Sequence, residues 1–583
     1  MYKTTKIVAA GAATVVLAMG MAACGGGEEK KGPEATAEFN AAVTGVVNAS
    51  DKAGGTLNLA INGDADFYDP ARAYYAWVWD FMRLYTRTLI NFDPKPGVEG
   101  LKMVPDLATE VPQSPDGGKT WKFTLKDGVQ FEDGTPITSK DIKYGIERVF
   151  ATDVISGGPV YLIDWLDNGQ NYKGPYTDTD PNKLGLKSIE TPDDKTIIFH
   201  LKAPFQDFLN LLTMPDTSPV PASKDTKDKY TLKPFSSGPY KFESYQPGKS
   251  VALVRNTAWK KDTDPIRKAL PDKINLTIGL APDDIDNRLM AGTVDIDLAQ
   301  TGVQPAAQAK ILSNPDLKKN ADANVSGFIR YVSIQSKVPP FDNIACRRAV
   351  QYAADKSTMQ TARGGPIAGG DIASTMLPTT LKEYQKFDLY PSDGGKGDIA
   401  KAKEQLAACG KPDGFTTVLA SRNAGKEPRS AEALQAGLKR AGINAQIQKF
   451  DPANYFSSVI GVPDNVHKKG FGLAMAGWGA DAPAAYFFLS EIVDGRKIKP
   501  KGNQNYSELN DPAINSMIDQ TFTEPDEAKR TKLWQDIDKK VMEDATLMPF
   551  VYDKALNYRN PRVTNVYITP AFGFYDFQAF GVG

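Results

Sequence analysis

The sequence predicts a large α/β protein of several domains. Apolar residues alternate in some segments, as strands require, and recur every three or four residues in others, as helices require. Within 415–450 a strand, a helix that ends at Gly442 and a second strand follow one another, which predicts a parallel pair with a right-handed crossover. The 583 residues suffice for two to four domains, and 41% hydrophobic and 24% charged residues are ordinary for a globular protein.

The amino terminus has the pattern of a bacterial export signal. Lys3 and Lys6 precede an apolar stretch, 7–22, which is short for a membrane span of about 20 residues and fits the core of a signal peptide. Two alanines directly before Cys24 resemble the lipobox of bacterial lipoproteins, which implies cleavage before Cys24 and lipidation of its sulfur. The alternative is an uncleaved anchor helix. The following residues, to about 51, lack periodicity and read as a flexible tether.

Local patterns in the first half of the mature chain predict strands and two helices. We expect a strand over 55–63, a helix over 77–90 and a hairpin within 121–137 that turns at Asp127-Gly128. Thr138, three residues before Asp141, predicts a capping box and a helix to about Phe150. Further strands are expected over 196–201 and on both sides of a turn at 247–248.

The second half adds the βαβ unit and longer helices. A helix is expected over 347–355, an apolar strand over 471–477, and amphipathic helices over 513–522 and 527–544. The tail from Pro549 alternates short strands and loops that are rich in aromatic residues.

Three cysteines bear on the compartment. Cys24 is assigned to the lipid, which leaves Cys346 and Cys409. An exported protein meets an oxidising environment, so an even pair favours a disulfide. The alternative is two buried free thiols, because both cysteines lie in helical patterns.

Composition and motifs argue against several function classes. The net charge of −1 does not favour nucleic acid as a partner. Only two histidines occur, and the sequence lacks a P-loop, an HExxH motif and a CxxC motif, so we expect no cofactor, no metal site and no catalytic residues.

The one positive site signal is the segment Trp478-Gly479-Ala480-Asp481, which directly follows an expected strand. In open α/β sheets, ligands bind beyond the carboxyl ends of strands. A bulky aromatic side chain and a carboxylate placed there can supply an apolar wall and an anchor for a cation. Alternatively, Asp481 caps a helix over 484–492.

Several segments, in order along nearly the whole mature chain, resemble the peptide-type solute-binding proteins of ABC importers, known as family 5. The most specific match is 121–144, which contains the Asp-Gly turns and the capping box. The other matching segments are Pro105-Asp106-Leu107-Ala108, 237–242, Arg255-Asn256, 290–295, 341–343, 347–355 and Trp478-Gly479-Ala480-Asp481. One departure is Ala482, which stands before Pro483 where the family usually has an acidic residue.

The resemblance implies a two-lobed periplasmic-binding-protein fold (type II, similar to cluster C) with an extra subdomain inserted in the first lobe. Two chain crossings would form a hinge. The implied divisions are a signal peptide over 1–23, a tether over 24–51, lobe 1 over 52–97, 230–327 and 549–583, the inserted subdomain over 98–229, and lobe 2 over 328–548.

The resemblance also implies an extracytoplasmic lipoprotein that is not an enzyme. A peptide would lie in the cleft and pair with strand edges, with its ammonium on Asp481 and Trp478 as a wall, beside Gly477 and Ala480. The loaded protein, expected to be a monomer on the outer face of the cytoplasmic membrane, would dock on a permease. Alternatives are another solute on the same fold, such as an oligosaccharide, a metal chelate or a small antibiotic-like molecule, and an extracellular hydrolase.

Overall fold

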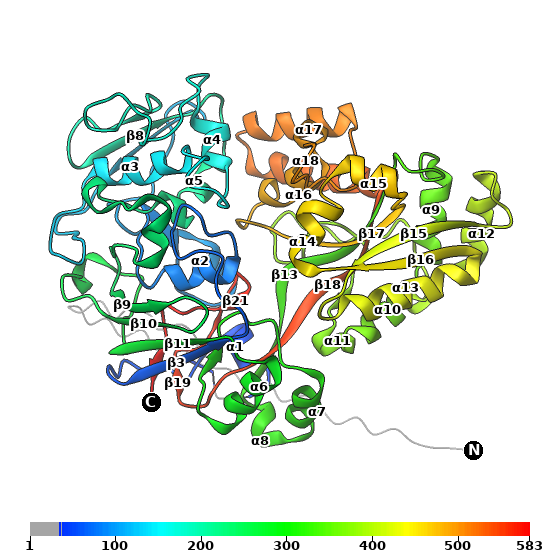
Figure 1. Cartoon of the computed structure of the whole chain (residues 1–583), viewed down its shortest axis with the longest axis horizontal. Coiled ribbons are helices and arrows are strands. Elements are labelled where there is room, and N and C mark those ends of the chain that lie inside the picture. Colours follow the sequence, from blue (N-terminus) through cyan, green and yellow to red (C-terminus); the bar gives the residue numbers. More distant parts are fainter. Residues whose placement is uncertain (1–33, 36–37) are drawn as a thin grey trace, which may run out of the picture.

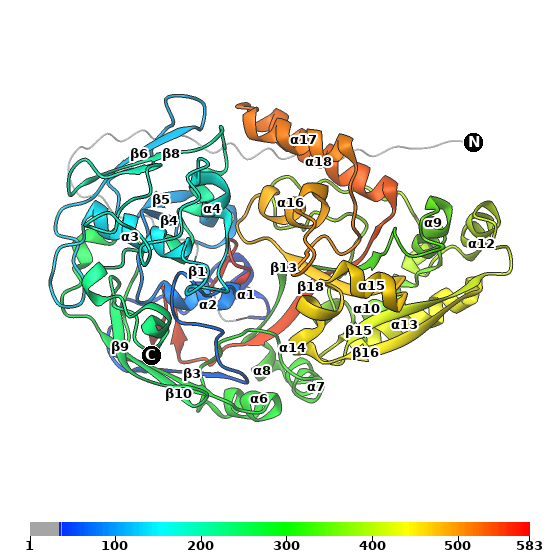
Figure 2. The same ribbon diagram turned by 45° about the horizontal axis from the view of Figure 1, so that its top comes forward.

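The computed structural model describes residues 34–35 and 38–583, so the expected signal peptide and Cys24 lie outside the described residues. Two lobes lie side by side, each built around its own sheet, and helices cover the sheets (Figure 1). Seen from a direction turned by 45°, the two lobes remain separate bodies joined by β13 and β18 (Figure 2). The fold is therefore a two-lobed α/β architecture: the α/β class was expected from the sequence pattern, and the two lobes were implied by the resemblance to family 5.

Lobe 1 is built on a five-stranded sheet in which β3 runs parallel to β11 and β12. Its strands, in sheet order, are β12 (Ile296–Asp297), β3 (Thr56–Ile61), β11 (Lys273–Ile278), β10 (Ser250–Arg255) and β9 (Tyr240–Gln246). Its helices are α1 (Ala41–Thr44), α2 (Ala76–Met82), α6 (Pro282–Ala291), α7 (Pro305–Ser313) and α8 (Pro315–Lys318). The pair expected on both sides of 247–248 is confirmed as β9 and β10.

The segment from 90 to about 215 carries a small three-stranded sheet, β6-β8-β7, at the opposite end of lobe 1 from the main sheet (Figure 1). Its strands are β4 (Ile90–Phe92), β5 (Met103–Pro105), β6 (Thr120–Thr124), β7 (Ile189–Glu190) and β8 (Thr196–His200). Its helices are α3 (Ser139–Val149), α4 (Tyr161–Leu166) and α5 (Phe208–Leu211). The capping box is confirmed: the backbone N–H of Thr138 donates to Asp141 Oδ2 at 2.8 Å.

The hairpin predicted to turn at Asp127-Gly128 is wrong, whereas the chain does turn back at Asp133-Gly134, where the N–H of Phe131 donates to the carbonyl of Thr135. β6 pairs antiparallel with β8, more than seventy residues further along the chain, and not with the segment after Asp127-Gly128. Val129 and Phe131 are buried, but only an isolated bridge joins Gln130 to Pro136. The turn signal at Asp127-Gly128 predicted that β6 pairs with the segment that follows the turn. The distant strand β8, with buried Ile197 and Phe199, pairs with β6 instead.

The helix predicted over 77–90 is also shorter than expected, because it ends at Met82. The carbonyl oxygens of the residues after Met82 accept hydrogen bonds from a distant segment of the chain. Tyr85 O accepts hydrogen bonds from the N–H groups of Ser237 and Gly238, and Leu84 O accepts one from Tyr240. These carbonyls are therefore occupied by the start of β9 and do not continue a helix.

Lobe 2 is built on a six-stranded mixed sheet. In sheet order its strands are β14 (Asp371–Ile372), β18 (Leu547–Tyr558), β13 (Ala321–Ile334), β17 (Leu473–Gly479), β15 (Phe415–Arg422) and β16 (Ile443–Phe450). Its helices are α9 (Ile344–Ala353), α10 (Lys356–Ala362), α11 (Gly365–Ala368), α12 (Ile399–Ala408), α13 (Glu427–Ala441), α14 (Pro452–Asn454), α15 (Pro463–Lys469), α16 (Tyr486–Val493), α17 (Pro512–Thr523) and α18 (Glu527–Asp544). The βαβ prediction is confirmed, because β15 and β16 are parallel neighbours in the sheet and α13 connects them.

The two longest strands, β13 and β18, join the lobes. Their first and last residues, Ala321 and Tyr558, pack in a core cluster with α6 and α7 of lobe 1, while Val332 and Val551 pack in lobe 2. Between these ends the register shifts: Val325 pairs with Lys554, but Ile329 pairs with Tyr552. The bulge leaves Ser326, Gly327 and Phe328 without partners in β18 at the junction between the lobes, although Phe328 still pairs with Gly479 of β17.

The tether predicted over 24–51 is wrong in its second part, because residues from 38 onward dock on lobe 1. Ala41, Ala42 and Val47 are buried. The N–H of Ala42 donates to Asp322 Oδ1 at 3.0 Å, and Val47 exchanges backbone hydrogen bonds with Val566. The segment has no periodic apolar pattern, but its small residues pack because they cover the first residues of β13.

The two ends of the chain add short strands. The tail forms β19 (Val563–Thr564), β20 (Ile568–Thr569), β21 (Phe574–Tyr575) and β22 (Gly581–Val582), and the amino-terminal part forms β1 (Glu34–Ala35) and β2 (Val46–Val47).

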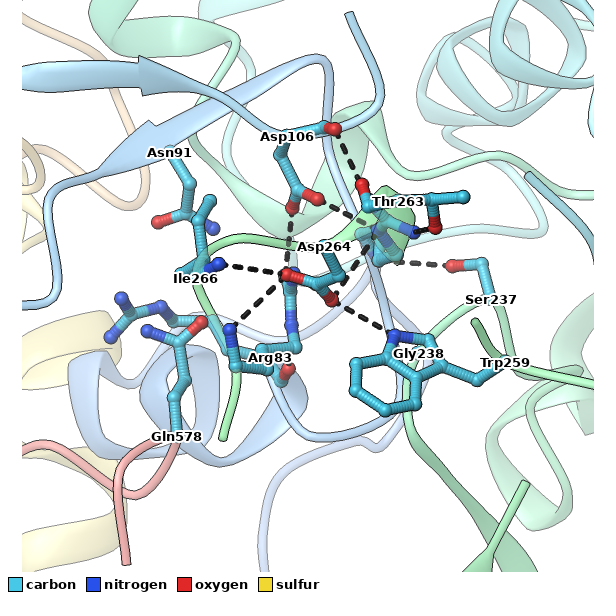
Figure 3. Close-up of polar contacts among 12 residues, drawn as sticks. Arg83, Asn91, Asp106, Ser237, Gly238, Trp259, Thr263, Asp264, Ile266 and Gln578 are labelled. Atoms are coloured by element: carbon cyan, nitrogen blue, oxygen red, sulfur yellow. Dashed lines mark hydrogen bonds and ion pairs between the residues drawn. The ribbon is translucent and has the colours of Figure 1, made fainter. Parts of the chain in front are cut away.

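A buried ion network ties the first segments of lobe 1 together. Arg87 and Arg267 both bind Asp106, at 2.7 and 2.8 Å, and Arg267 also binds Asp264 at 3.0 Å. All four side chains are at most 2% exposed. Figure 3 shows the two carboxylates facing each other among Trp259, Thr263 and Ile266. Asp106, which belongs to one of the segments that resemble family 5, therefore holds lobe 1 together.

A disulfide joins Cys346, in α9, to Cys409, at the end of α12. It links two helices on the outer side of lobe 2. Among the described residues, none of the helices has the length and apolar character needed to cross a bilayer.

Candidate functional site

The end of β17 forms one wall of the space between the lobes, and its glycines make room for side chains of β13. Gly477 lies opposite Arg330, and Gly479 lies opposite Phe328. A Cβ atom at Gly477 would lie 2.7 Å from Arg330 Nη1, and one at Gly479 would lie 2.9 Å from the Phe328 ring. Both distances are too short for real contacts, so larger residues would displace Arg330 and Phe328 from the wall.

Asp481 follows this strand, and its carboxylate faces lobe 1. Oδ2 accepts hydrogen bonds from the hydroxyl groups of Tyr74, at 2.8 Å, and Tyr161, at 2.5 Å. The alternative that Asp481 caps the following helix is wrong, because α16 begins after Ala485 and has no side-chain cap. The two tyrosines therefore fix the carboxylate at the interface between the lobes.

Burial raises the pKa of Asp481 to about 7, although the hydrogen bonds from Tyr161 and Tyr74 act in the opposite direction. The nearby cation Lys497 is paired with Glu491. Asp481 itself forms no ion pair within the described residues. The carboxylate thus lacks a cation that would hold it fully ionised at neutral pH.

An aromatic cluster closes the lobes on the side of Asp481. Trp165 stacks on Phe205 with ring centroids 4.1 Å apart, and both rings contact Tyr486 of α16 and Phe522 of α17. Trp165 Nε1 donates to the Tyr486 hydroxyl at 3.2 Å. Edge-to-face pairs of this kind add about 0.5–1.5 kcal/mol each beyond area burial. In this structure the lobes are therefore in contact around the site.

A cavity of about 570 Å³ lies against Asp481, and we call it the Asp481 cavity. All four predicted ligand-binding residues line it: Gly477, Trp478, Ala480 and Asp481. Lobe 1 contributes aromatic side chains, among them Tyr74, Tyr75 and Phe572, and lobe 2 contributes Phe456 and Tyr506, whose rings stack at 6.0 Å. The structure brings the predicted residues together; that they bind a ligand stays a prediction.

A second cavity, of about 760 Å³, adjoins the first, and we call it the basic cavity. Tyr75, Phe328, Arg330 and Arg422 are among the residues that line both cavities. The two spaces are therefore parts of one cleft between the lobes. Tyr75 and Trp77 stack in parallel at 6.0 Å on the lobe 1 side of the basic cavity.

Sequence reasoning missed most of the cleft. Tyr74 and Tyr161 lie about four hundred and three hundred residues before Asp481. Arg330 lies in a strand whose local pattern gives no sign of a cleft. The aromatic run Tyr74-Tyr75-Ala76-Trp77 was the one available signal, because such a run exposes large rings that need a partner or a ligand.

The described residues contain no group of three or more His, Cys, Asp or Glu side chains arranged to hold a metal ion. The cleft offers aromatic faces, guanidinium groups and the carboxylates of Asp481, Glu427 and Asp553. These groups bind and orient a solute through hydrogen bonds, ion pairs and apolar contact.

Comparison with known proteins agrees with this geometry. The family model described as "Bacterial extracellular solute-binding proteins, family 5 Middle" matches residues 102–500. The solved structure of "Clavulanic acid biosynthesis oligopeptide binding protein 2" is 46% identical, superposes with a TM-score of 0.91, and covers 94% of this chain and 99% of its own.

Other relatives are more distant. The "Glutathione-binding protein GsiB" of Salmonella typhi is 25% identical over 465 residues, which are 79% of this chain and 82% of that protein. The structure of the "ABC transporter-associated periplasmic binding protein DppA from Helicobacter pylori in complex with peptide STSA" is 22% identical, with a TM-score of 0.71 over 91% of this chain and 99% of its own, and shares the fold.

Proposed function

The chain belongs to family 5 of the bacterial extracellular solute-binding proteins, and on this premise we propose that it captures peptides in the cleft between its lobes. It would then hand them to the membrane permease of an ABC importer without changing a covalent bond. The relatives named for oligopeptide and glutathione binding support a peptide as the solute.

One observation carries the proposal: a half-buried carboxylate at the cleft wall has hydrogen-bond donors but no cation among the described residues. Asp481 is oriented by the hydroxyl groups of Tyr74 and Tyr161 and forms no ion pair within the described residues. The ammonium group at the amino terminus of a peptide is a cation of the right charge and size. A charge-assisted hydrogen bond in such a site is about twice as strong as a neutral one.

The other residues of the Asp481 cavity would hold the peptide nearby. Trp478 and Phe328 would give apolar walls, and the glycines beside them keep those walls in place. The cavity volume of about 570 Å³ falls within the usual range of about 300–1,000 Å³ for ligand pockets. Closure of the lobes about β13 and β18 would then enclose the peptide.

Anchoring at the membrane would rest on Cys24. A diacyl group on its sulfur would hold the body at the outer face of the cytoplasmic membrane, where the permease lies. The segment before Cys24 has the small residues that lipoprotein processing needs.

The test is titration calorimetry of the purified mature body with defined peptides. We expect peptides with free amino termini to bind, and their N-acetylated forms to bind at least tenfold more weakly. Native mass spectrometry of the protein as purified separates the alternatives: co-purified peptides support the proposal, and co-purified glycans in their place contradict it. Catalytic turnover of a peptide mixture would identify a hydrolase instead.

A further inference from the structure

The basic cavity has an excess of positive charge. Six cationic side chains line it, against the two carboxylates of Glu427 and Asp553. The six are Arg330, Arg363, Arg422, Lys426, Arg429 and Lys554. The Asp481 cavity, by contrast, has Asp481 at one side and shares only Arg330 and Arg422 of this set.

Part of the excess is compensated within the protein. Asp553 lies between Arg330, at 2.8 Å, and Arg363, at 2.7 Å, and the positive charges around it hold its pKa well below the usual range. Glu427 pairs with Arg422, and Lys554 pairs with Asp371 at 2.7 Å. These pairs leave one arginine of the Asp553 group without a carboxylate of its own.

Lys426 and Arg429 add charge that no described carboxylate balances. The ammonium group of Lys426 donates to the carbonyl oxygens of Ala368 and Lys554 and forms no ion pair among the described residues. Burial lowers the pKa of Lys426 to about 8. Arg429 is exposed and likewise has no ion pair in the described part of the chain. Both side chains thus line the cavity with their charges unmatched.

The amino-terminal end of α13 faces the same space. Gly425, Lys426 and Glu427 line the cavity, and this fifteen-residue helix has no side-chain cap. The N–H of Glu427 already donates to the Ala424 carbonyl and Pro428 has no N–H, so it is the positive end of the helix dipole that favours an anion there. The helix follows β15, so the position is also beyond the carboxyl end of a parallel strand.

We propose that the basic cavity binds the anionic end of the ligand and selects peptides that carry at least two carboxylates at the carboxyl-terminal end, as in a peptide that ends with an acidic residue. The inference rests on the proposed peptide-binding function. The two ends of the cleft then have opposite charges: Asp481 receives the ammonium group, and Lys426, Arg429 and the two arginines that share Asp553 (Arg330 and Arg363) receive the carboxylates.

The experiment compares peptides of equal length, from three to five residues, that end in Glu or in Gln. In titration calorimetry with the wild-type body, we expect the Glu peptide to bind at least tenfold more tightly than its Gln partner. The double variant Lys426→Gln/Arg429→Gln should reduce that ratio to below about threefold. The matched double variant Lys439→Gln/Arg440→Gln removes the same charge at the other end of α13 and should keep the wild-type ratio.

The outcomes separate this inference from the function on which it rests. Equal affinity for Glu and Gln peptides, or a ratio that survives in Lys426→Gln/Arg429→Gln, overturns the inference while peptide binding stands. An equal fall of the ratio in the control variant also overturns it, because the effect is then one of net charge. Failure of every peptide to bind overturns the proposed function as well.

Discussion

Two clusters of arginine and aspartate in this molecule have similar composition and opposite character. In the lobe 1 network, two arginines face two carboxylates, and every side chain is at most 2% exposed. In the cleft, Asp553 is shared by Arg330 and Arg363, and Lys426 lies close by without a carboxylate. The first cluster is complete within the protein, and the second is not.

The difference indicates what each cluster does. A buried ion network that satisfies all its partners fixes the arrangement of the segments that contribute to it, and removal of one partner leaves an unpaired charge. An unbalanced cluster that lines a cavity can gain its missing charge from a ligand. Balance therefore distinguishes residues that hold the fold from residues that are available for binding.

The largest effect is expected from breaking the balanced network. Arg267→Ala leaves Asp106 and Asp264 with one arginine between them and should lower the free energy of unfolding by about 3–5 kcal/mol. Urea denaturation followed by circular dichroism measures it. Arg429→Ala, in the unbalanced cluster, is the control and should change stability by less than about 0.5 kcal/mol. Similar losses in the two variants would contradict the distinction.

The disulfide in lobe 2 provides a contribution to stability with which the contribution of the lobe 1 ion network can be compared. The disulfide between Cys346 and Cys409 closes a loop of 63 residues, and Cys346→Ser/Cys409→Ser should lower the free energy of unfolding by about 2–4 kcal/mol. Denaturation of wild type with and without reductant checks the same quantity without a substitution. No change under either condition would show that the link does not stabilise the native state.

Asp481 tests the role of the cleft residues in ligand binding. Asp481→Asn keeps the size of the side chain and removes the charge, so peptides with free amino termini should lose about 1.5–3 kcal/mol of binding free energy. N-acetylated peptides should bind the variant and the wild type almost equally, as calorimetry can measure. An equal loss for both kinds of peptide would contradict the anchor role.

The smallest effect concerns pH. The pKa of Asp481 is about 7 in the free protein, with Tyr74, Tyr161, Glu491 and Lys497 around it. An ammonium ligand binds the ionised form, so affinity should be greatest above pH 7 and should fall by up to about tenfold per pH unit below it. The Asp481→Asn variant should lack this dependence between about pH 5 and 7. A wild-type affinity that rises as the pH falls would contradict the assignment.

The sequence predicted those parts of the fold that depend on near neighbours. The βαβ unit over 415–450 and the capping box at Thr138 follow from spacing alone, and both are confirmed. The hairpin after β6 was wrong because the edge of that strand is taken by β8, and no local signal gives the partner of an edge. The expected end of the helix at 90 was wrong because the carbonyl group of Tyr85, three residues beyond the end of α2, accepts hydrogen bonds from Ser237 and Gly238, which come from far along the chain.

The candidate site shows the same limit. Trp478 and Asp481 were found because they follow the strand that the sequence predicts over 471–477, although β17 itself continues through Trp478 to Gly479. Arg330 and Asp553 were missed because they come from strands more than two hundred residues apart, whose pairing creates the site. Apolar spacing reports which face of an element is buried, but it does not report which charged residues meet across two elements.

If the chain is anchored through Cys24, as proposed, the docked amino-terminal segment determines which lobe is attached more directly to the membrane. Residues 40–48 are fastened to lobe 1 through Asp322, Pro561 and Val566, so a pull on the chain from the membrane reaches lobe 1 first. In the described part of the chain, lobe 2 follows this segment by way of lobe 1, so it would receive such a pull indirectly. In a lipid-anchored protein, lobe 1 would then be the fixed lobe and lobe 2 the moving lobe, so thermal motion of the anchor would not open the cleft between them.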